Sequence, residues 1–178
     1  LEMGIIFGML LSLVLLLFRI MKPRVAFPPH RAHLLPPEAV AAGVVDDRRI
    51  VRMRFEGSLV FANVAFFEEQ LQKLLASNPQ LKVLIIDAVS INEVDASGDQ
   101  MIRDYYKRLT ESGINVLFSR VKKPILAMFE RSHMHEDVPR EFFHRNPVDV
   151  FKHAWNMIKE SEEHVESEES SKSEDGDN

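Results

Sequence analysis

The feature that most constrains this chain is an uncharged apolar segment near its start, MGIIFGMLLSLVLLLF, at residues 3–18. A membrane-spanning helix needs about 20 predominantly apolar residues. The sixteen residues of this segment therefore form most of a span. The segment begins almost at the first residue, which is Leu1 rather than Met, as expected if part of the span lies upstream. We expect residues 1–22 to be a truncated transmembrane helix.

Two other interpretations of the apolar segment are weaker. A signal peptide carries positive charge before its apolar run, whereas Arg19, Lys22 and Arg24 follow this one. A buried core helix normally has a polar face, and here only Ser12 is polar. Because cytoplasmic flanks of spans are enriched in Lys and Arg, we expect the rest of the chain to be cytoplasmic. The protein would then lie in the cell (inner) membrane.

The charge of the chain is unevenly distributed. Its net charge of −5 combines nine acidic residues and one Lys from Glu160 onward with a mildly basic remainder. Residues 160–178 are dominated by Ser, Glu and Asp, and such a composition buries too little apolar surface to fold. We therefore predict a disordered acidic tail over 160–178, with its C-terminus in the cytoplasm. The weak positive charge elsewhere does not indicate a nucleic-acid partner.

Between span and tail, the sequence predicts a linker and one folded domain. Residues 23–47 contain five prolines, which favour extended, irregular backbone. Over residues 48–159, apolar runs alternate with helical periodicity, which is typical of an α/β domain with a mainly parallel sheet. The runs predict strands at 51–55, 59–62, 81–86 and 114–118, and a short edge strand at 142–143. Helical spacing predicts helices after Asn63 as N-cap and around 101–109, 124–129 and 148–158.

Two stretches resemble a known family. FEGSLVFANVAFFEEQL, at residues 55–71, and VLIIDAVSINEVDASGDQMIRDYYKRLTESGINVLFSRVKKPI, at residues 83–125, resemble the STAS domain of sulfate transporters and anti-sigma-factor antagonists. The most specific parts are F-x-N before the first helix and I-x-x-V-D-x-S-G before the second. With the preceding apolar helix, the chain resembles the C-terminal part of a SulP-type (sulfate permease family) anion transporter. The resemblance implies a STAS-type fold with a mixed, mainly parallel sheet.

The resemblance also implies a function. It implies the last membrane span and the cytoplasmic regulatory and interaction domain of a secondary anion transporter of sulfate type. The expected partners are the rest of the membrane domain, a second copy in a homodimer, and a cytoplasmic regulatory protein. This part alone would transport nothing. Two alternatives stay open, namely a membrane-tethered signalling module like the anti-sigma antagonists and a weakly nucleotide-binding regulatory domain.

The candidate regulatory site is Asp95-Ala96-Ser97-Gly98. In the anti-sigma antagonists, the resemblance implies phosphorylation of a hydroxyl residue directly after the Asp, but here that position is Ala96. The phosphorylation switch is therefore lost. We expect Ser97 to cap the second helix. The amides of Ser97 and Gly98 are candidates for binding an anion or a nucleotide phosphate, and Asp95 is expected to cap the helix or position the loop.

The remaining polar residues suggest little chemistry. Asp87 ends a buried strand and could hold Mg²⁺ with Asp95, although ordering of the following loop is the favoured interpretation. A cluster of polar loop residues after the third helix lacks metal-ligand spacing, so we expect it to be solvated: His133, His135, Glu136, Asp137 and His144. No G-x-S-x-G elbow or glycine-rich phosphate loop occurs. We therefore predict no enzyme activity, no metal, and no cofactor beyond weak GTP or ATP binding.

Overall fold

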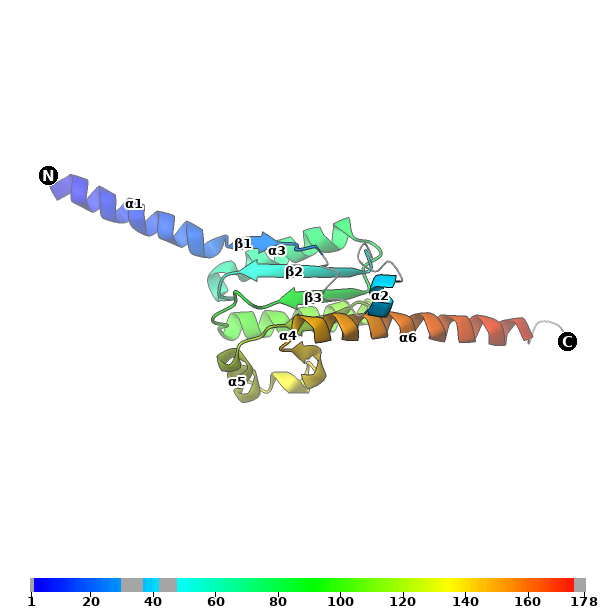
Figure 1. The fold of residues 1–178 in the computed structure, drawn as a ribbon. Helices are drawn as coiled ribbons and strands as arrows, with labels where there is room; N and C mark the ends of the chain where they lie inside the picture. The colour runs from blue at the N-terminus through cyan, green and yellow to red at the C-terminus, as the bar shows by residue number, and fades with distance from the viewer. Residues whose placement is uncertain (1, 30–36, 42–47, 175–178) are drawn as a thin grey trace.

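The structure, a computed structural model, describes residues 2–29, 37–41 and 48–174. An apolar helix precedes five strands and further helices (Figure 1). The strands are β1 (Arg24–Ala26), β2 (Ile50–Glu56), β3 (Val83–Asp87), β4 (Asn115–Ser119) and β5 (Phe143–His144). The α-helices are α1 (Glu2–Met21), α2 (Pro37–Ala41), α3 (Phe61–Ser77), α4 (Ala96–Glu111), α5 (Lys123–Arg131) and α6 (Pro147–Glu174).

The five strands form one mixed sheet in the order β1-β2-β3-β4-β5. β2, β3, β4 and β5 run parallel, and β1 joins β2 in the antiparallel direction. α3 and α4 cover one face of the sheet, while α6 crosses the other face (Figure 1). The predicted α/β fold with a mainly parallel sheet is confirmed.

Burial explains why the central strands are apolar. Every residue of β3 is buried, as expected for a strand covered on both faces. One core cluster lies between the sheet and α3, α4 and α5 and includes Phe55, Phe67 and Phe129. A second cluster lies under α6 and includes Phe151 and Trp155. The two clusters hold the sheet between helical layers.

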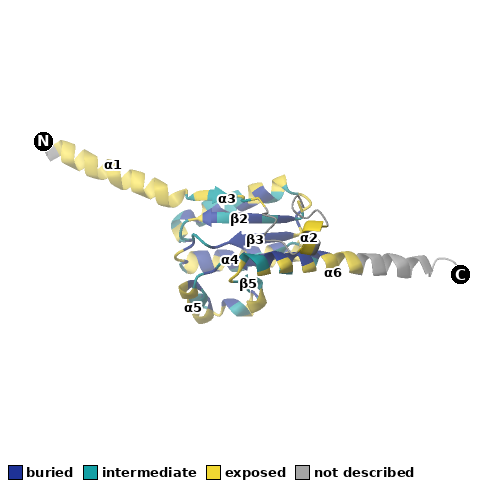
Figure 2. Cartoon of the chain, in the orientation of Figure 1, coloured by how far each residue is buried: buried dark blue, intermediate teal, exposed yellow. Residues whose placement is uncertain are grey.

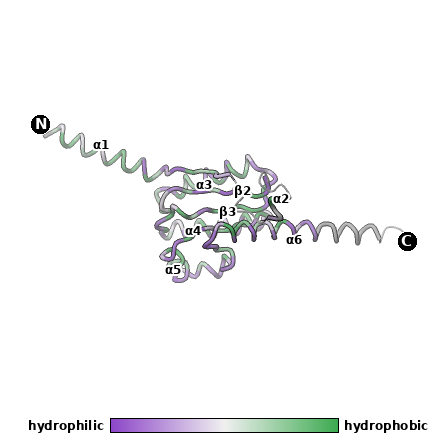
Figure 3. Tube along the Cα trace, in the orientation of Figure 1, coloured by the Kyte–Doolittle hydropathy of each residue, from purple (hydrophilic) through white to green (hydrophobic). Residues whose placement is uncertain are grey.

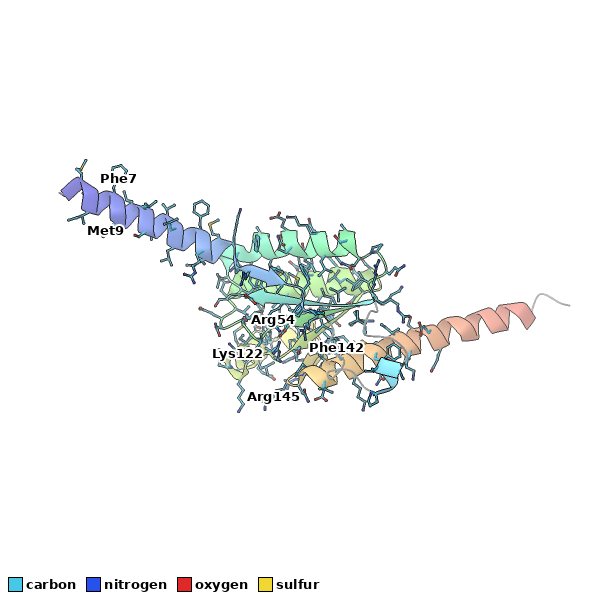
Figure 4. All side chains as sticks on the ribbon, turned by 45° about the horizontal axis from the view of Figure 1, so that its top comes forward. Phe7, Met9, Arg54, Lys122, Phe142 and Arg145 are labelled. Atoms are coloured by element: carbon cyan, nitrogen blue, oxygen red, sulfur yellow. The ribbon has the colours of Figure 1, made fainter. Side chains whose placement is uncertain are left out.

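The apolar helix α1 projects away from the domain. Its side chains from Met3 to Met21 are exposed (Figure 2) and hydrophobic along the length (Figure 3). Phe7 and Met9 point into open space (Figure 4). Met3–Met21 has 19 residues with a mean hydropathy of 2.4, and no part of it is buried in the chain. α1 is therefore long and apolar enough to cross a membrane.

The linker is more structured than predicted. Residues Arg24–Ala26, expected to be irregular, form β1 and pair with Arg54–Glu56 of β2. The strand forms because Val25 packs against the core and the segment covers the open edge of β2. Residues 37–41 form the short helix α2. The other linker residues, 30–36 and 42–47, lie outside the described residues.

The last helix continues into the predicted tail. α6 runs to Glu174, and the predicted disorder of residues 160–178 stays a prediction. Formation of the first turn of a helix is unfavourable, and the half of α6 that packs on the sheet already provides it. Each further residue then extends the helix at little additional cost in free energy. Glu and Lys are good helix formers, and Glu162 pairs with Arg49 beyond the sheet. Residues 175–178 lie outside the described residues.

The region between β2 and α3 holds no second strand. Leu59 makes one isolated bridge to Val94, and α3 begins at Phe61 with Val60 as its N-cap. Asn63, predicted to be the N-cap, lies three residues further, inside the first turn. The predicted edge strand after α5 exists as β5, shifted by one residue to Phe143–His144.

Candidate functional site

The predicted site residues gather at the carboxyl edge of the sheet, where β2, β3 and β4 end. Asp87 is the last residue of β3, and Asp95 precedes α4. α1 reaches the domain at the same edge, because Arg24 at the start of β1 pairs with Glu56 at the end of β2 (Figure 1). The end of the apolar helix and the beginnings of α3 and α4 therefore meet there.

Asp95 connects the starts of two helices. Its carboxylate accepts a hydrogen bond from the Gly98 amide of α4 at 2.9 Å and from the Phe61 amide of α3 at 2.8 Å. Burial alone would raise the pKa of Asp95, but the bonds from the Phe61, Gly98 and Ser97 amides outweigh it and lower the pKa. The expectation that Asp95 caps the helix is confirmed. Ser97 is exposed and is not the N-cap.

Gly98 allows α4 to lie against the chain before α3. A Cβ at this position would stand 2.4 Å from the Leu59 carbonyl oxygen and 3.0 Å from a Val94 methyl carbon. The same Leu59 carbonyl accepts the Asp95 amide at 3.1 Å. The V-D-x-S-G pattern thus combines a capping carboxylate with a glycine at a close backbone contact.

The candidate anion site at this corner is partly occupied by the protein itself. The amides of Ser97 and Gly98 were candidates for binding an anion or a nucleotide phosphate, and both already interact with the Asp95 carboxylate. A bound anion would have to displace that carboxylate. Nucleotide binding remains a prediction that this geometry does not favour. Ala96, at the lost phosphorylation position, is exposed.

Asp87 is a buried acid held by two arginines. Arg120 binds it in bidentate fashion, with Nε 3.0 Å from Oδ1 and an Nη atom on Oδ2. Arg54 reaches Oδ2 through Nε at 3.0 Å. Burial alone would raise the pKa of Asp87, but the bonds from Arg120 and Arg54 outweigh it and lower the pKa.

The favoured interpretation of Asp87 as an acceptor that orders the loop agrees with the structure. Its Oδ1 atom also accepts the Val89 amide at 3.3 Å. Its carboxylate is thereby engaged by side chains and loop backbone. Within residues 2–29, 37–41 and 48–174, no three His, Asp or Glu side chains lie close enough together to hold a metal ion.

The two arginine partners of Asp87 were not predicted from the sequence. Arg52 and Arg54 alternate with apolar residues in β2, which is typical of solvated charges on a strand. In the structure they face α6, where Arg52 is 5% exposed beside the Phe151 ring and Arg54 meets Asp87. The signal that could reveal the Arg54 pair is the register, in which Arg54 aligns with Asp87.

The histidines do not form one cluster. His133 is exposed, as expected for a solvated loop. His135, by contrast, packs edge-on against Phe143 and lies 3.4 Å from Glu130. His144 contacts His153 of α6, with Nε2 and Nδ1 2.9 Å apart. Pairing of His144 with a residue nine positions later was not predicted.

Asn63 fixes the point where α1 enters the domain. It is 2% exposed. Its Nδ2 donates to the carbonyl of Ile20, near the end of α1, at 3.2 Å and to that of Ser58 at 2.8 Å. Its Oδ1 accepts the Val60 amide at 3.1 Å. One buried side chain thus joins the apolar helix to the turn before α3.

Gly57, in the turn after β2, lies close to Pro23, just after the end of α1. A Cβ at Gly57 would lie 2.9 Å from Cβ of Pro23, which separates α1 from β1. β1 then continues the contact along the edge of β2. Helix α1 is therefore attached to the sheet by a strand, by the close approach of Gly57 to the Pro23 ring and by the Asn63 bonds.

Comparison with known proteins agrees with this architecture. The STAS domain family matches residues 42–147. Sulfate transporter 1.2 of Arabidopsis thaliana is 22% identical over 145 residues, covering 74% of this chain and 22% of the relative. Sulfate transporter 1.3 of the same plant is 21% identical over 147 residues. The chain spans about a fifth of the length of these relatives.

Solved structures share the fold. The murine solute carrier 26 family member A9 anion transporter, in its inward-facing state, superposes with a TM-score of 0.67 and 16% identity, over 85% of this chain and 25% of that one. The STAS domain of a SulP transporter from Vibrio cholerae gives 0.54 and 18% identity over 64% and 86%. The resemblance found in the sequence is confirmed.

Proposed function

The chain belongs to the STAS domain family, and from this membership we propose that it is the last membrane span and the cytoplasmic regulatory domain of a secondary anion transporter of sulfate type. The observation that carries the proposal is the continuous connection from an exposed apolar helix into the sheet. α1 ends at Met21, and β1 begins only three residues later, at Arg24. This short connection supports the proposal that a membrane span leads directly into the STAS domain.

The comparisons support the transporter context. The two plant relatives are sulfate transporters, and they match most of this chain but only about a fifth of their own length. The transporter structure superposes on a larger part of the chain than the isolated STAS domain does. In this account, the anion pathway lies in helices outside the present sequence.

The attachment of the helix supports the proposed regulatory role. Because the Ile20 carbonyl is held by the buried Asn63, the end of α1 and the turn before α3 move together. A regulatory protein or a second copy that binds the domain would shift the end of this span. Conversely, a change in the membrane domain would alter the surface presented to partners.

The signalling alternative has less support. A phosphorylation switch needs a hydroxyl at the position of Ala96, and the neighbouring Ser97 lies one position later in the first turn of α4. The absence of enzyme activity and the weak nucleotide binding stay predictions. The proposed role of the chain is therefore architectural and regulatory.

The test is sulfate uptake by the complete protein in cells without sulfate uptake of their own. Uptake is expected from the complete protein, strongly reduced uptake after removal of residues 48–159, and none from residues 1–178 alone. Surface labelling must show that the shortened protein reaches the membrane. A complete protein with a single span and no uptake of sulfate or other small anions would contradict the proposal.

A further inference from the structure

A groove lies at the junction between the apolar helix and the domain. Its volume is about 710 Å³, and it opens between the last two turns of α1, the start of β1 and the turn from β2 to α3. Its lining includes the apolar residues Leu16, Ile20 and Val60 and the basic residues Arg19, Lys22 and Arg24. Apolar and cationic walls thus share one groove.

The three basic side chains are exposed. Within the described parts of the chain, none of them makes a salt bridge. The groove also contains two carboxylates, Glu56 and Glu93, and Glu56 faces Arg24 across the β1–β2 pair. Outside the lining, Glu69 of α3 also interacts with Lys22, since Lys73 and, more weakly, Lys22 lower the pKa of this glutamate. Among the lining residues themselves, three cations against two carboxylates leave an excess of positive charge, which favours an anionic ligand.

The position of the groove identifies the type of anion. Met3–Met21 has 19 residues, and at 1.5 Å per residue this helix is about 29 Å long, close to the thickness of a bilayer's hydrocarbon core. The groove begins at Leu16 and extends just past the end of α1. It therefore lies at the depth of the lipid headgroups, with its apolar wall toward the acyl chains.

An exposed aromatic side chain supports this depth independently. Phe61, the first residue of α3, is 76% exposed, and it follows Val60 of the groove wall. Exposure to water of a ring of this size is unfavourable, and burial among acyl chains next to the headgroups would remove that cost. The Phe61 side chain and the basic residues would then contact the same membrane surface.

We propose that this groove binds the headgroup of one anionic phospholipid. Arg19, Lys22 and Arg24 hold its phosphate, and Leu16 and Ile20 contact the upper part of an acyl chain. Because Asn63 joins Ile20 to the turn before α3, the bound lipid contacts both sides of the junction and stabilises its geometry. The inference rests on the proposed function, since it requires α1 to span the membrane.

The experiment is native mass spectrometry of the complete protein, released from nanodiscs of phosphatidylcholine mixed with phosphatidylglycerol. The groove variant combines Arg19→Gln, Lys22→Gln and Arg24→Gln. The matched control combines Lys122→Gln, Lys123→Gln and Arg145→Gln, three cations outside the groove lining. At about fivefold for each lost cation, the groove variant should retain phosphatidylglycerol about a hundredfold more weakly than the wild type, whereas the control should retain it like the wild type.

The experiment distinguishes failure of the lipid site from failure of the proposed function. Equal retention by the groove variant and the wild type would overturn the lipid site. Displacement of phosphatidylglycerol by inorganic phosphate or glycerol phosphate at equal concentration would show instead a site for soluble anions, which also overturns it. Thermal melting checks that the groove variant is folded. If the protein does not insert into nanodiscs at all, the proposed function fails, whereas insertion and uptake without selective lipid retention contradict only this inference.

Discussion

Asp87 shows most clearly what a single residue contributes to the domain. Its side chain is 1% exposed and lies between Arg54 and Arg120, which are 27% and 29% exposed. Removal of the carboxylate in Asp87→Ala leaves two partly buried cations without this partner. The free energy of unfolding should fall by about 3 kcal/mol, measured by urea unfolding of the full chain in detergent micelles.

The control for this substitution is Asp104→Ala, which removes an exposed carboxylate from α4 and should change stability by less than about 0.5 kcal/mol. The pKa of Asp87 is lowered in the folded state. Its contribution is therefore present above the ordinary Asp pKa of about 3.9 and is lost as the pH falls through the folded value. An Asp87→Ala chain as stable as the wild type at neutral pH would contradict this account.

His144 should make the domain sensitive to mild acid. Burial lowers its pKa and proximity to His153 lowers it further, whereas Asp149 acts in the opposite direction. The unfolded state then takes up the proton first, so stability should fall as the pH drops below the ordinary His pKa of about 6.5. Unfolding curves of His144→Gln should lose part of this dependence, and those of exposed His133→Gln should keep it.

Contacts between residues close in the sequence could be predicted, whereas contacts between distant residues could not. The capping role of Asp95 is local, since the carboxylate and the Gly98 amide are three positions apart, and the sequence pattern predicted it. Arg54 and Asp87 are 33 positions apart, and their contact depends on the register of β2 against β3. Alternation within one strand cannot show that register, so Arg54 looked solvated.

At the scale of elements, Gly98 decides how α4 meets the chain before α3. Gly98→Ala places a methyl group 2.4 Å from the Leu59 carbonyl oxygen, a backbone atom that cannot swing aside. A cost of about 2 kcal/mol is expected from such overpacking, seen as a lower unfolding midpoint. Ser97→Ala, one residue earlier and exposed, serves as the control, and equal stability of both variants would refute this interpretation.

The strand β1 should protect the open edge of β2. A chain that begins at residue 48 lacks β1, so the N–H and C=O groups of Arg54–Glu56 lose their partners. Unpaired strand edges promote association. Size-exclusion chromatography should therefore show self-association that a chain beginning at residue 23 does not show. A monomeric chain from residue 48 at the same concentration would mean that β1 has no protective role.

Helices and strands were predicted correctly where the apolar pattern of their own residues determines the type of structure. The continuous apolar run of β3 and the helical spacing of α4 gave the correct type of structure. β1 was missed because three residues in a proline-rich segment become a strand only through the edge of β2. The length of α6 could not be predicted from composition, which describes residues 160–178 in isolation and not as the continuation of a helix packed on the sheet.

At the scale of the whole molecule, the two ends of the chain point in opposite directions. α1 leaves the domain at the carboxyl edge of the parallel strands, and α6 extends past the other end (Figure 1). The basic residues Arg19, Lys22 and Arg24 lie at the first end, and the chain from Glu160 onward carries a net charge of −8. If α1 spans a membrane, as we propose, like charge would repel the acidic end from an anionic membrane surface.

In the function that we propose, the domain acts on transport through the junction at Asn63. The most direct measurement is the initial rate of sulfate uptake by the complete protein with Asn63→Ala, at matched amounts in the membrane. The control is Asn78→Ala, which removes a similar side-chain bond to the Leu74 carbonyl at the far end of α3. The account predicts a rate about fivefold lower for Asn63→Ala, equivalent to about 1 kcal/mol of coupling, and an unchanged rate for Asn78→Ala. Equal rates for wild type and Asn63→Ala would contradict it.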